Sequence, residues 1–252
     1  MRPPDPGPVA RRGGSRNDGV AALIPALNEE EALPGVLASL RALGIGRIVV
    51  VDNGSTDGTA RVAREGGAEV VLEPRRGYGA ACLAGMCHLA LRPPEVLVFL
   101  DGDQSDDPAA LDRLLAPIRS GKADLVVGIR TAPPSGGASA VPLHARMGNR
   151  LVLLGMRLLH GVRARDLGPF RAIRHSALVR LGMDDRDWGW TVQMQLRAHH
   201  LGIRVCEVEV PHRPRAAGRS KVSGSLSGSF RAGKKMLFTL IAERRRAGSG
   251  GN

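Results

Sequence analysis

Residues 96–103 read VLVFLDGD, five apolar side chains followed at once by an Asp-Gly-Asp sequence. An uninterrupted apolar run of this length is typical of a strand that is buried on both faces of a sheet. Asp101 and Asp103 stand where such a strand would end, and two carboxylates in this position suit a hard divalent cation that also binds phosphate oxygens. On its own, an Asp-x-Asp sequence is most often a solvated turn, so the segment has to be judged with its neighbours.

The same pattern occurs twice earlier in the chain. The apolar run 20–27 is followed by Asn28 and Glu29, and the run 47–52 (RIVVVD) ends at Asp52 in the segment DNGSTDGT. Helical spacing of apolar residues follows each run. Alternating strands and helices predict an α/β fold with a Rossmann-like, mostly parallel sheet flanked by helices. Because ligands bind such sheets at the carboxyl ends of the strands, we expect the three polar clusters to line one cleft.

The rest of the chain supplies further elements of both kinds. We expect strands at 69–72, 124–130, 166–173 and 204–210, and helices at 29–43, 57–65, 79–91, 108–119, 143–159, 191–201 and 230–246. Residues 1–18, rich in Pro and Arg, predict a disordered basic arm, and 247–252 a flexible tail. Between them we expect one domain, 19–246. Its first half, 19–130, carries the polar strand ends, and its second half, 131–246, is a C-terminal extension.

The chain is strongly basic, with 36 Lys and Arg against 24 Asp and Glu and a net charge of +12. Such an excess favours anionic partners: phosphorylated ligands, anionic lipid or nucleic acid. Aromatic residues make up only 3%, which argues against the base-stacking surfaces of proteins that bind single-stranded nucleic acid. No apolar run approaches the ~18 residues of a spanning helix, and the first residues lack a signal-peptide core, so we expect a cytoplasmic location.

Taken in order, these motifs make the chain resemble glycosyltransferase family 2, whose members have the GT-A fold. In the first half the resemblance rests on four segments: PALNEE from Pro25, VDNGSTDGT from Val51, GYGAA from Gly77 and DGD from Asp101. The second half is similar to the dolichyl-phosphate mannose synthase-like branch, which makes polyprenyl-phosphate sugars. It rests there on DLGPFR at 166–171, the helix that follows Gly189, and RAAGRSK at 215–221. Each segment is weak alone, but the ordered set spans residues 20 to about 240.

The resemblance implies that the first two strand ends bind the donor, a UDP- or GDP-linked sugar. Pro25, Asn28 and Glu29 would lie at the nucleotide base and the ribose. Asp52 would hydrogen-bond the base. A capped turn that leads into a helix is the structural alternative for the segment around Asp52.

The resemblance also implies a divalent-metal site and a closing loop. Asp103 would be a catalytic residue that coordinates Mg²⁺ or Mn²⁺, with Asp101 at the ribose or the metal. Arg215, Ser220 and Lys221 match the R-x-x-G-x-S-K loop that closes over the donor phosphates in the family. There Arg215 and Lys221 would stabilise the charge of the leaving group, as catalytic residues. A solvated, charged loop is the alternative.

Two positions depart from the family's pattern. Ser105 stands where the synthases often have a Gln that helps to hold the metal, so the third metal ligand is open. Gln193 stands where a Glu is usual, and a neutral amide cannot accept a proton. A hydroxyl acceptor gains about 10²–10⁴ in rate from a general base. A phosphate monoester, with a second pKa near ~6, is already mostly ionised at pH 7 and needs no base.

The missing base therefore favours a lipid-phosphate acceptor of the polyprenyl or dolichyl phosphate kind. Arg130 and Arg146, at the end of the fifth strand and on the next helix, are the expected ligands of its phosphate. Asp184, Asp185 and Asp187 would still offer a base if they faced the cleft. A polar turn before a helix is the alternative interpretation of these three residues.

Two basic amphipathic helices predict reversible binding to an anionic membrane surface, as a peripheral protein at the inner face. The helix 143–159 carries four apolar residues on one side: Met147, Leu151, Leu154 and Leu158. The final helix sets three apolar residues against two lysines: Phe238, Leu240 and Ile241 against Lys234 and Lys235. The alternative is that both faces pack on the sheet or across a homodimer.

Three other functions stay open from the sequence. A family 2 enzyme could glycosylate a soluble or glycan hydroxyl instead of a lipid. A nucleotidyltransferase shares the sheet architecture but usually has a Gly-rich, basic first loop, whereas 28–30 is acidic here. A nucleic-acid-binding module is suggested by charge alone, and no nucleic-acid partner is expected.

Overall fold

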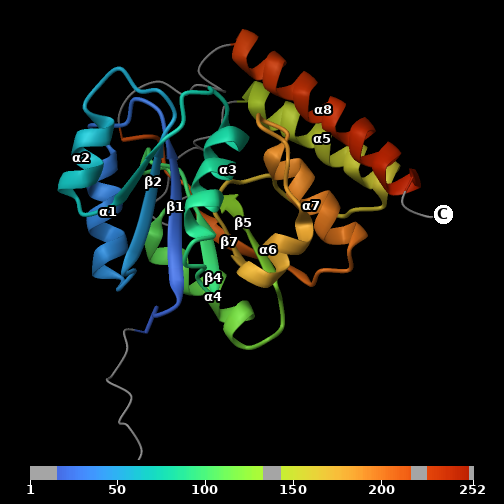
Figure 1. The fold of residues 1–252 in the computed structure, drawn as a ribbon. Helices are drawn as coiled ribbons and strands as arrows, with labels where there is room; N and C mark the ends of the chain where they lie inside the picture. Colours follow the sequence, from blue (N-terminus) through green and yellow to red (C-terminus); the bar gives the residue numbers. More distant parts are fainter. Residues whose placement is uncertain (1–15, 133–142, 217–225, 250–252) are drawn as a thin grey trace, which may run out of the picture.

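The computed structural model describes residues 16–132, 143–216 and 226–249. Ser220, Lys221 and most of the expected basic arm lie outside these residues. The described part forms a sheet with helices on both faces, and two long helices pack against one of the helical layers (Figure 1). The α/β expectation is therefore confirmed.

Within the described residues, one mixed sheet of seven strands organises the fold. The strands are β1 (Val20–Ala26), β2 (Arg47–Asp52), β3 (Glu69–Leu72), β4 (Val96–Phe99), β5 (Leu125–Thr131), β6 (Arg171–Arg174) and β7 (Val205–Pro211). Their order is β3-β2-β1-β4-β6-β5-β7. All neighbouring pairs are parallel except those of β6, which is antiparallel to both β4 and β5. The mostly parallel sheet expected from the continuous apolar runs is confirmed, because β1, β2 and β4 are buried on both faces.

Helices cover the two faces of the sheet. One face packs against α1 (Leu33–Ala42), α2 (Thr59–Glu65), the 3₁₀ helix η1 (Pro108–Ala110) and α4 (Leu111–Arg119). The other face packs against α3 (Tyr78–Leu89), α6 (His175–Leu181) and α7 (Trp190–His200). Leu and Ile side chains at helical spacing in α1 and α4 fill the first core, which explains why their periodicity could be read from the sequence.

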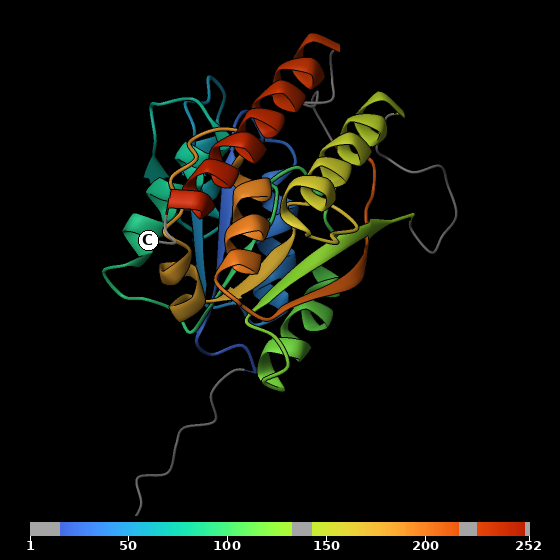
Figure 2. The same cartoon turned by 90° about the vertical axis from the view of Figure 1, so that its right-hand side faces the viewer.

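Two long helices, α5 (Leu143–His160) and α8 (Leu226–Ser249), lie side by side and outside α7 (Figures 1 and 2). A third, smaller apolar cluster joins them to α7, with Val152 and Met156 from α5 and Leu240 from α8. None of the helices in the described ranges is long and apolar enough to span a bilayer. The last helix continues to Ser249, so it includes the first residues of the expected tail.

The apolar side of α5 that the sequence indicates does not pack on the protein. Its four residues, here called the α5 stripe, are 50–72% exposed: Met147, Leu151, Leu154 and Leu158. On α8, Phe238 and Ile241 are also exposed, but Leu240 is fully buried in the third cluster. The expectation that Leu240 shares an outward face with Phe238 and Ile241 is therefore wrong, whereas the α5 stripe does face outward.

Candidate active site

The carboxyl ends of β1, β2 and β4 lie next to one another and bring the expected polar clusters together. Ala26 pairs with Asp52 in the parallel register of β1 and β2, and Leu23 pairs with Phe99 in that of β1 and β4. The backbone N–H of Asn53 donates to the carbonyl of Ala26 at 2.9 Å, which continues the ladder beyond the strand. The loops after the three strands therefore start from the same edge of the sheet.

The turn after β1 is held by the segment after β2. Asn28 has a φ of 55°, a conformation that Asn adopts more readily than most residues, and its Oδ1 accepts the N–H of Thr56 at 2.8 Å. The N–H of Glu29 donates to Thr59 Oγ1 at 2.8 Å. Pro25, half-buried on β1, leads into this turn. Asn28 and Glu29 are thus fixed beside the DNGST segment.

Asp52 and Asn53 at the end of β2 are both buried and have different partners. The carboxylate of Asp52 accepts the N–H of Ser55 at 2.8 Å, so a capped turn is present here as well. The side-chain amide of Asn53 donates to two carbonyls of the loop 73–77, and its Oδ1 accepts an N–H of the same loop. Asn53 therefore fixes the loop that leads into α3, a role that the sequence motif around it does not reveal.

Four acidic side chains concentrate negative charge at the site: Asp101, Asp103, Asp106 and Glu29. Burial raises the pKa of Asp101 well above its usual value, and the nearby charges of Asp103 and Asp106 raise it further. Ser105 donates both its N–H and its hydroxyl to Oδ1 of Asp103. Oδ1 of Asp106 is buried and has no hydrogen-bond partner among the described residues. Such a cluster is stabilised by a cation.

Arg215 brings one cation to this cluster from the second half of the chain. Its guanidinium lies 2.7 Å from Oδ2 of Asp103 and also contacts Oε1 of Glu29. Backbone N–H groups on both sides of Arg215 donate to carbonyls of the segment 103–105. The structure therefore brings Arg215 together with Asp103 and Glu29, whereas the other two residues of the loop, Ser220 and Lys221, lie outside the described residues.

The acidic residues fit a hard divalent cation in their chemistry. Carboxylate oxygens are the side-chain ligands that Mg²⁺ and Mn²⁺ prefer. Oδ1 of Asp106 accepts no hydrogen bond from the described residues, and Nδ1 of His212 lies 3.6 Å from it. In the part of the chain that is described, no three His, Cys, Asp or Glu side chains form a complete metal site. Asp103 and Asp101 would therefore hold a metal together with donor phosphate oxygens. Ser105, at the position of the family's Gln, binds Asp103 instead.

Arg130 and Arg146, the expected ligands of an acceptor phosphate, lie on neighbouring elements. Nε and Nη2 of Arg130 donate to the two carboxylate oxygens of Asp166, at 2.8 and 2.7 Å. Burial alone would raise the pKa of Asp166, but these hydrogen bonds outweigh it and the pKa is lowered. Asn149 of α5 donates to the same carboxylate at 3.2 Å. Arg146, three residues before Asn149, is exposed.

The aspartates before α7 are engaged in hydrogen bonds and ion pairs, and so is Gln193. Asp184 accepts hydrogen bonds from Gln193, Arg197 and Arg246. Asp185 accepts one from Thr239 and forms an ion pair with Lys235 at 3.5 Å. Oε1 of Gln193 accepts two backbone N–H groups, from 184 and 185, and its amide donates to Asp184 and Glu243. The structure favours the polar-turn interpretation for Asp184 and Asp185, because their carboxylates hold the turn against α7 and α8. Asp187 takes part in the turn through its backbone N–H, which donates to Asp185 at 2.8 Å.

An aromatic contact joins the start of α3 to the loop before α7. Tyr78, the first residue of α3, stacks on Trp188 with ring centroids 6.2 Å apart. A Cβ on Gly77 would lie 2.2 Å from a backbone carbonyl of the 185–188 loop, and one on Gly79 would lie 2.1 Å from another. The glycines of GYGAA therefore let this loop press on the start of α3. The sequence shows the Gly-x-Gly pattern but not the loop that requires it.

Acidic side chains at the carboxyl ends of parallel strands, joined to an arginine from a distant loop, place the chain in the class of GT-A-fold glycosyltransferases. The match to Glycosyl transferase family 2 covers residues 21–182, well over half of the chain. The chain belongs to this family and is a glycosyltransferase.

Several similar proteins support the same family. An undecaprenyl-phosphate mannosyltransferase of Micrococcus luteus is 34% identical over 220 residues, which cover 83% of this chain and 89% of the relative. A polyprenol monophosphomannose synthase of Mycolicibacterium smegmatis is 33% identical over 81% of this chain and 80% of its own. An uncharacterised glycosyltransferase of Mycobacterium tuberculosis is 46% identical over a stretch that covers 84% of this chain and 94% of the relative.

Solved structures agree on the fold. Glucosyl-3-phosphoglycerate synthase from Mycobacterium tuberculosis, in complex with Mn²⁺, UDP-glucose and phosphoglyceric acid, aligns with a TM-score of 0.72. The alignment covers 89% of this chain and 79% of that protein, at 23% identity. The GT-A fold expected from the sequence is confirmed.

Proposed function

We propose that the protein transfers a sugar from a nucleotide sugar to the phosphate of a polyprenyl-phosphate-type lipid, with inversion at the anomeric carbon and with Mg²⁺ or Mn²⁺ bound. The observation that carries the donor half of this proposal is the acidic cluster at the strand ends, bridged by Arg215 between Asp103 and Glu29. The names of two relatives, which are polyprenyl-phosphate mannosyltransferases, support the acceptor half.

On the donor side, each residue has a physical reason for its role. Asn28, Glu29 and Asp52 offer hydrogen-bond acceptors for the base and the ribose at adjacent strand ends. Asp103 and Asp101 would hold the divalent cation, which neutralises charge on the donor phosphates. Arg215 would exchange its carboxylate partners for the diphosphate as that group leaves, since a guanidinium binds either anion in the same forked geometry.

On the acceptor side, the reaction needs positive charge rather than a base. The amide group of Gln193 holds the turn 184–185 and binds Glu243 of α8, and a neutral amide cannot accept a proton. An acceptor phosphate oxygen would attack the anomeric carbon directly, forming the new C–O bond while the bond to the diphosphate breaks. Arg146 and Arg130 would hold this phosphate, and Arg130 would bind it while keeping its ion pair with Asp166.

A lipid acceptor implies contact with a membrane, and the exposed α5 stripe suits this. An apolar stripe flanked by Arg146, Arg150 and Arg157 has the composition of a helix that lies in the interface of an anionic bilayer. We place the protein at the inner, cytoplasmic face as a peripheral protein that salt releases. Each Lys or Arg near such a surface contributes about 1 kcal/mol, so a few suffice.

Sedimentation with phosphatidylglycerol vesicles tests the membrane half. The pair Leu151→Ser and Leu158→Ser should leave the protein in the supernatant. The matched pair Leu91→Ser and Leu201→Ser, also exposed apolar residues but on other elements, should still sediment. If the wild type itself stays in solution at low salt, membrane docking is wrong. If the wild type elutes as a dimer in gel filtration and Leu151→Ser with Leu158→Ser makes it a monomer, the stripe is a homodimer contact.

Transfer assays and calorimetry test the enzymatic half. Radiolabelled UDP- and GDP-sugars are incubated with polyprenyl phosphate and Mn²⁺, and the lipid product is extracted. Asp103→Asn should abolish both this product and the metal dependence of nucleotide binding, whereas Asp112→Asn, an exposed acid on α4, should change neither. Unchanged metal-dependent affinity in Asp103→Asn would exclude the metal role. A product that forms without lipid would favour the alternative of a soluble hydroxyl acceptor.

A further inference from the structure

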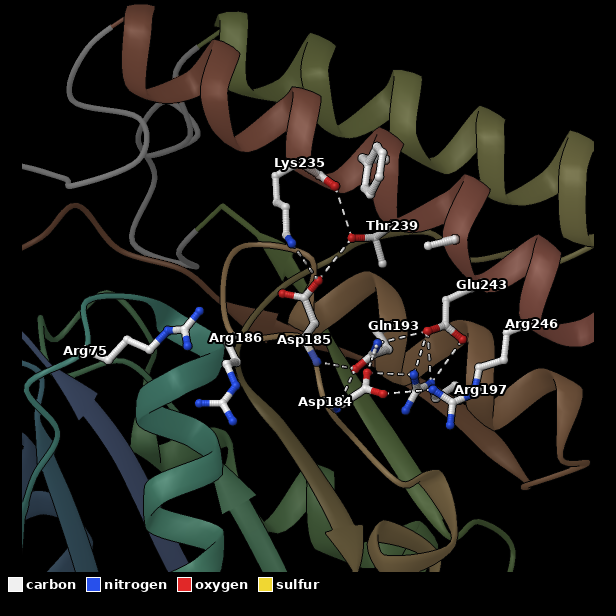
Figure 3. A pocket seen from close by; sticks show the side chains of 12 residues that line it. Arg75, Asp184, Asp185, Arg186, Gln193, Arg197, Lys235, Thr239, Glu243 and Arg246 are labelled. Atoms are coloured by element: carbon white, nitrogen blue, oxygen red, sulfur yellow. Dashed lines mark hydrogen bonds and ion pairs between the residues drawn. The ribbon is translucent and has the colours of Figure 1, made fainter.

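A pocket of about 410 Å³ lies between α8, α7 and the turn before α7 (Figure 3). This volume falls within the ~300–1,000 Å³ typical of small-molecule sites. Its walls come from the β3–α3 loop, from the turn 184–186, from α7 and from α8. None of the residues assigned above to the donor or the acceptor phosphate lines it.

Most charges in this pocket neutralise one another. Arg197 is paired with Glu243 and Asp184, and these contacts are at 2.7 Å. Lys235 is paired with Asp185 at 3.5 Å. Arg246 pairs with Asp184 at 2.8 Å. Three cations of α7 and α8 therefore balance the three acids of the pocket. Any further cation in the pocket has no acid left to pair with among the pocket's described residues, so an anion from outside the pocket would have to balance its charge.

Two guanidinium groups supply that further charge. Arg75 and Arg186 line the same pocket, on the side away from α8. Figure 3 draws both without a dashed line, and neither side chain has a hydrogen bond or ion pair with any described residue. Their main chains are fixed, because Asn53 binds the carbonyl of Arg75 at 2.7 Å and the N–H of Ala80 donates to the carbonyl of Arg186 at 3.0 Å.

The wall across from these arginines is partly apolar. Phe238 and Ala242 of α8 line the pocket, and the Phe238 side chain is 65% exposed. Ile241, next to Ala242, is exposed as well. The pocket thus combines two arginines that lack partners among the described residues with an apolar surface on the opposite side, on a helix that packs beside α5.

We infer that this pocket binds the headgroup of an anionic phospholipid. The phosphodiester would accept hydrogen bonds from Arg75 and Arg186, and the first carbons of the acyl chains would lie on Phe238 and Ala242. A forked guanidinium is well suited to phosphate oxygens, and the phosphodiester would supply the partner that each of these two side chains lacks among the described residues. The pocket shares no lining residue with the donor or acceptor assignments above, so the inference does not depend on the proposed sugar transfer.

Isothermal titration of the metal-free full chain with dihexanoyl-phosphatidylglycerol, below its micelle concentration, tests this inference. Saturable binding is expected in wild type, and Trp188, two residues from Arg186, gives a second readout by fluorescence. The double variant Arg75→Gln and Arg186→Gln should bind at least roughly tenfold more weakly, since it removes both charged donors to the phosphate. The control pair Arg64→Gln and Arg163→Gln, exposed arginines elsewhere with the same charge change, should bind as wild type.

Three further measurements distinguish lipid bound in this pocket from lipid bound elsewhere on the protein and from free phosphate. Dihexanoyl-phosphatidylcholine, which has the same chains but no net charge, should bind more weakly. Phe238→Ser should weaken binding of the lipid but not of inorganic phosphate. Equal affinity of the double variant and wild type, or loss of binding in Arg146→Gln alone, would overturn the inference, because the lipid would then lie elsewhere. Inorganic phosphate that binds as tightly as the lipid would exclude the phospholipid and leave a site for free phosphate.

Discussion

The contact between Gly79 and the turn before α7 allows a quantitative prediction. A Cβ at position 79 would lie 2.1 Å from the carbonyl oxygen of Asp185 and 2.9 Å from carbonyl carbons of Asp185 and Arg186. Ordinary van der Waals contact begins at 3.4 Å, so in Gly79→Ala the backbone of the turn must withdraw by about 1.3 Å. That shift breaks the hydrogen bond from Ala80 N–H to Arg186, now 3.0 Å long.

The expected cost follows from these changes. Overpacking costs about 1–3 kcal/mol, and the lost hydrogen bond about 0.5–1.5 kcal/mol. Replacing Gly by Ala in a helix returns about 0.5–1 kcal/mol. The free energy of unfolding should therefore fall by about 2 kcal/mol, which corresponds to a Tm lower by about 4–8 °C for a chain of this size.

Thermal and urea unfolding measure this loss directly. Gly148→Ala on α5 is the matched control, because its Cβ would meet nothing within 4 Å, and it should be neutral or stabilising. The fluorescence of Trp188, which stacks on Tyr78, should change in Gly79→Ala only. A Gly79→Ala protein that unfolds at the wild-type temperature would show that the turn does not press on α3.

Three further predictions concern activity, core charge and pH. Arg215→Ala and Lys221→Ala should lower kcat more than they lower nucleotide affinity. If both variants turn over at the wild-type rate, the loop is only a solvated linker without a catalytic role. Glu243→Gln should cost about 3 kcal/mol of unfolding free energy in urea, since it removes the buried partner of Arg197; a loss below about 1 kcal/mol would refute this. Hydrogen bonds from Arg47, and then His88, lower the pKa of Glu69 from 4.5 to about 2, so stability should fall as the pH drops through this range. In urea unfolding, the stability of Glu69→Gln should not fall over this pH range. If Glu69→Gln loses stability at low pH as the wild type does, the loss does not come from Glu69.

Much of the fold is predictable because its signals are local. The apolar runs of β1, β2 and β4 are continuous since both faces of these strands are covered, and the polar residues that follow them are covalently tied to the same edge of the sheet. The donor-side cluster could therefore be inferred from adjacency along the chain. The sequence does not predict helix α6, because its seven residues make only two turns, too few for a periodicity to show.

Other features depend on contacts between distant residues. The sequence predicts a strand at 166–173, but β6 begins only at Arg171, because Asp166 turns toward Arg130 and the residues between Asp166 and Arg171 form a loop. Arg215 meets Glu29 across 186 positions, and no local pattern indicates that pairing. The sequence likewise does not show which way the α5 stripe faces. The amphipathic pattern is the same whether the apolar side packs on the protein or faces outward.

The antiparallel strand β6 also bears on how the chain folds during synthesis. It is the neighbour of β4 on one side and of β5 on the other, so β5 has no partner strand until residues 171–174 have been made. On the ribosome, β1 to β4 can pair in the order in which they emerge. The apolar residues of β5, in contrast, stay exposed until β6 has been synthesised. The last pairing, of β5 with β7, joins residues 80 positions apart, as Leu125 does with Val205. A chain that stalls before β6 would therefore expose three strand edges that are paired in the finished sheet, one of β4 and both of β5. Unpaired strand edges promote aggregation, so such a stalled chain is a candidate for chaperone binding.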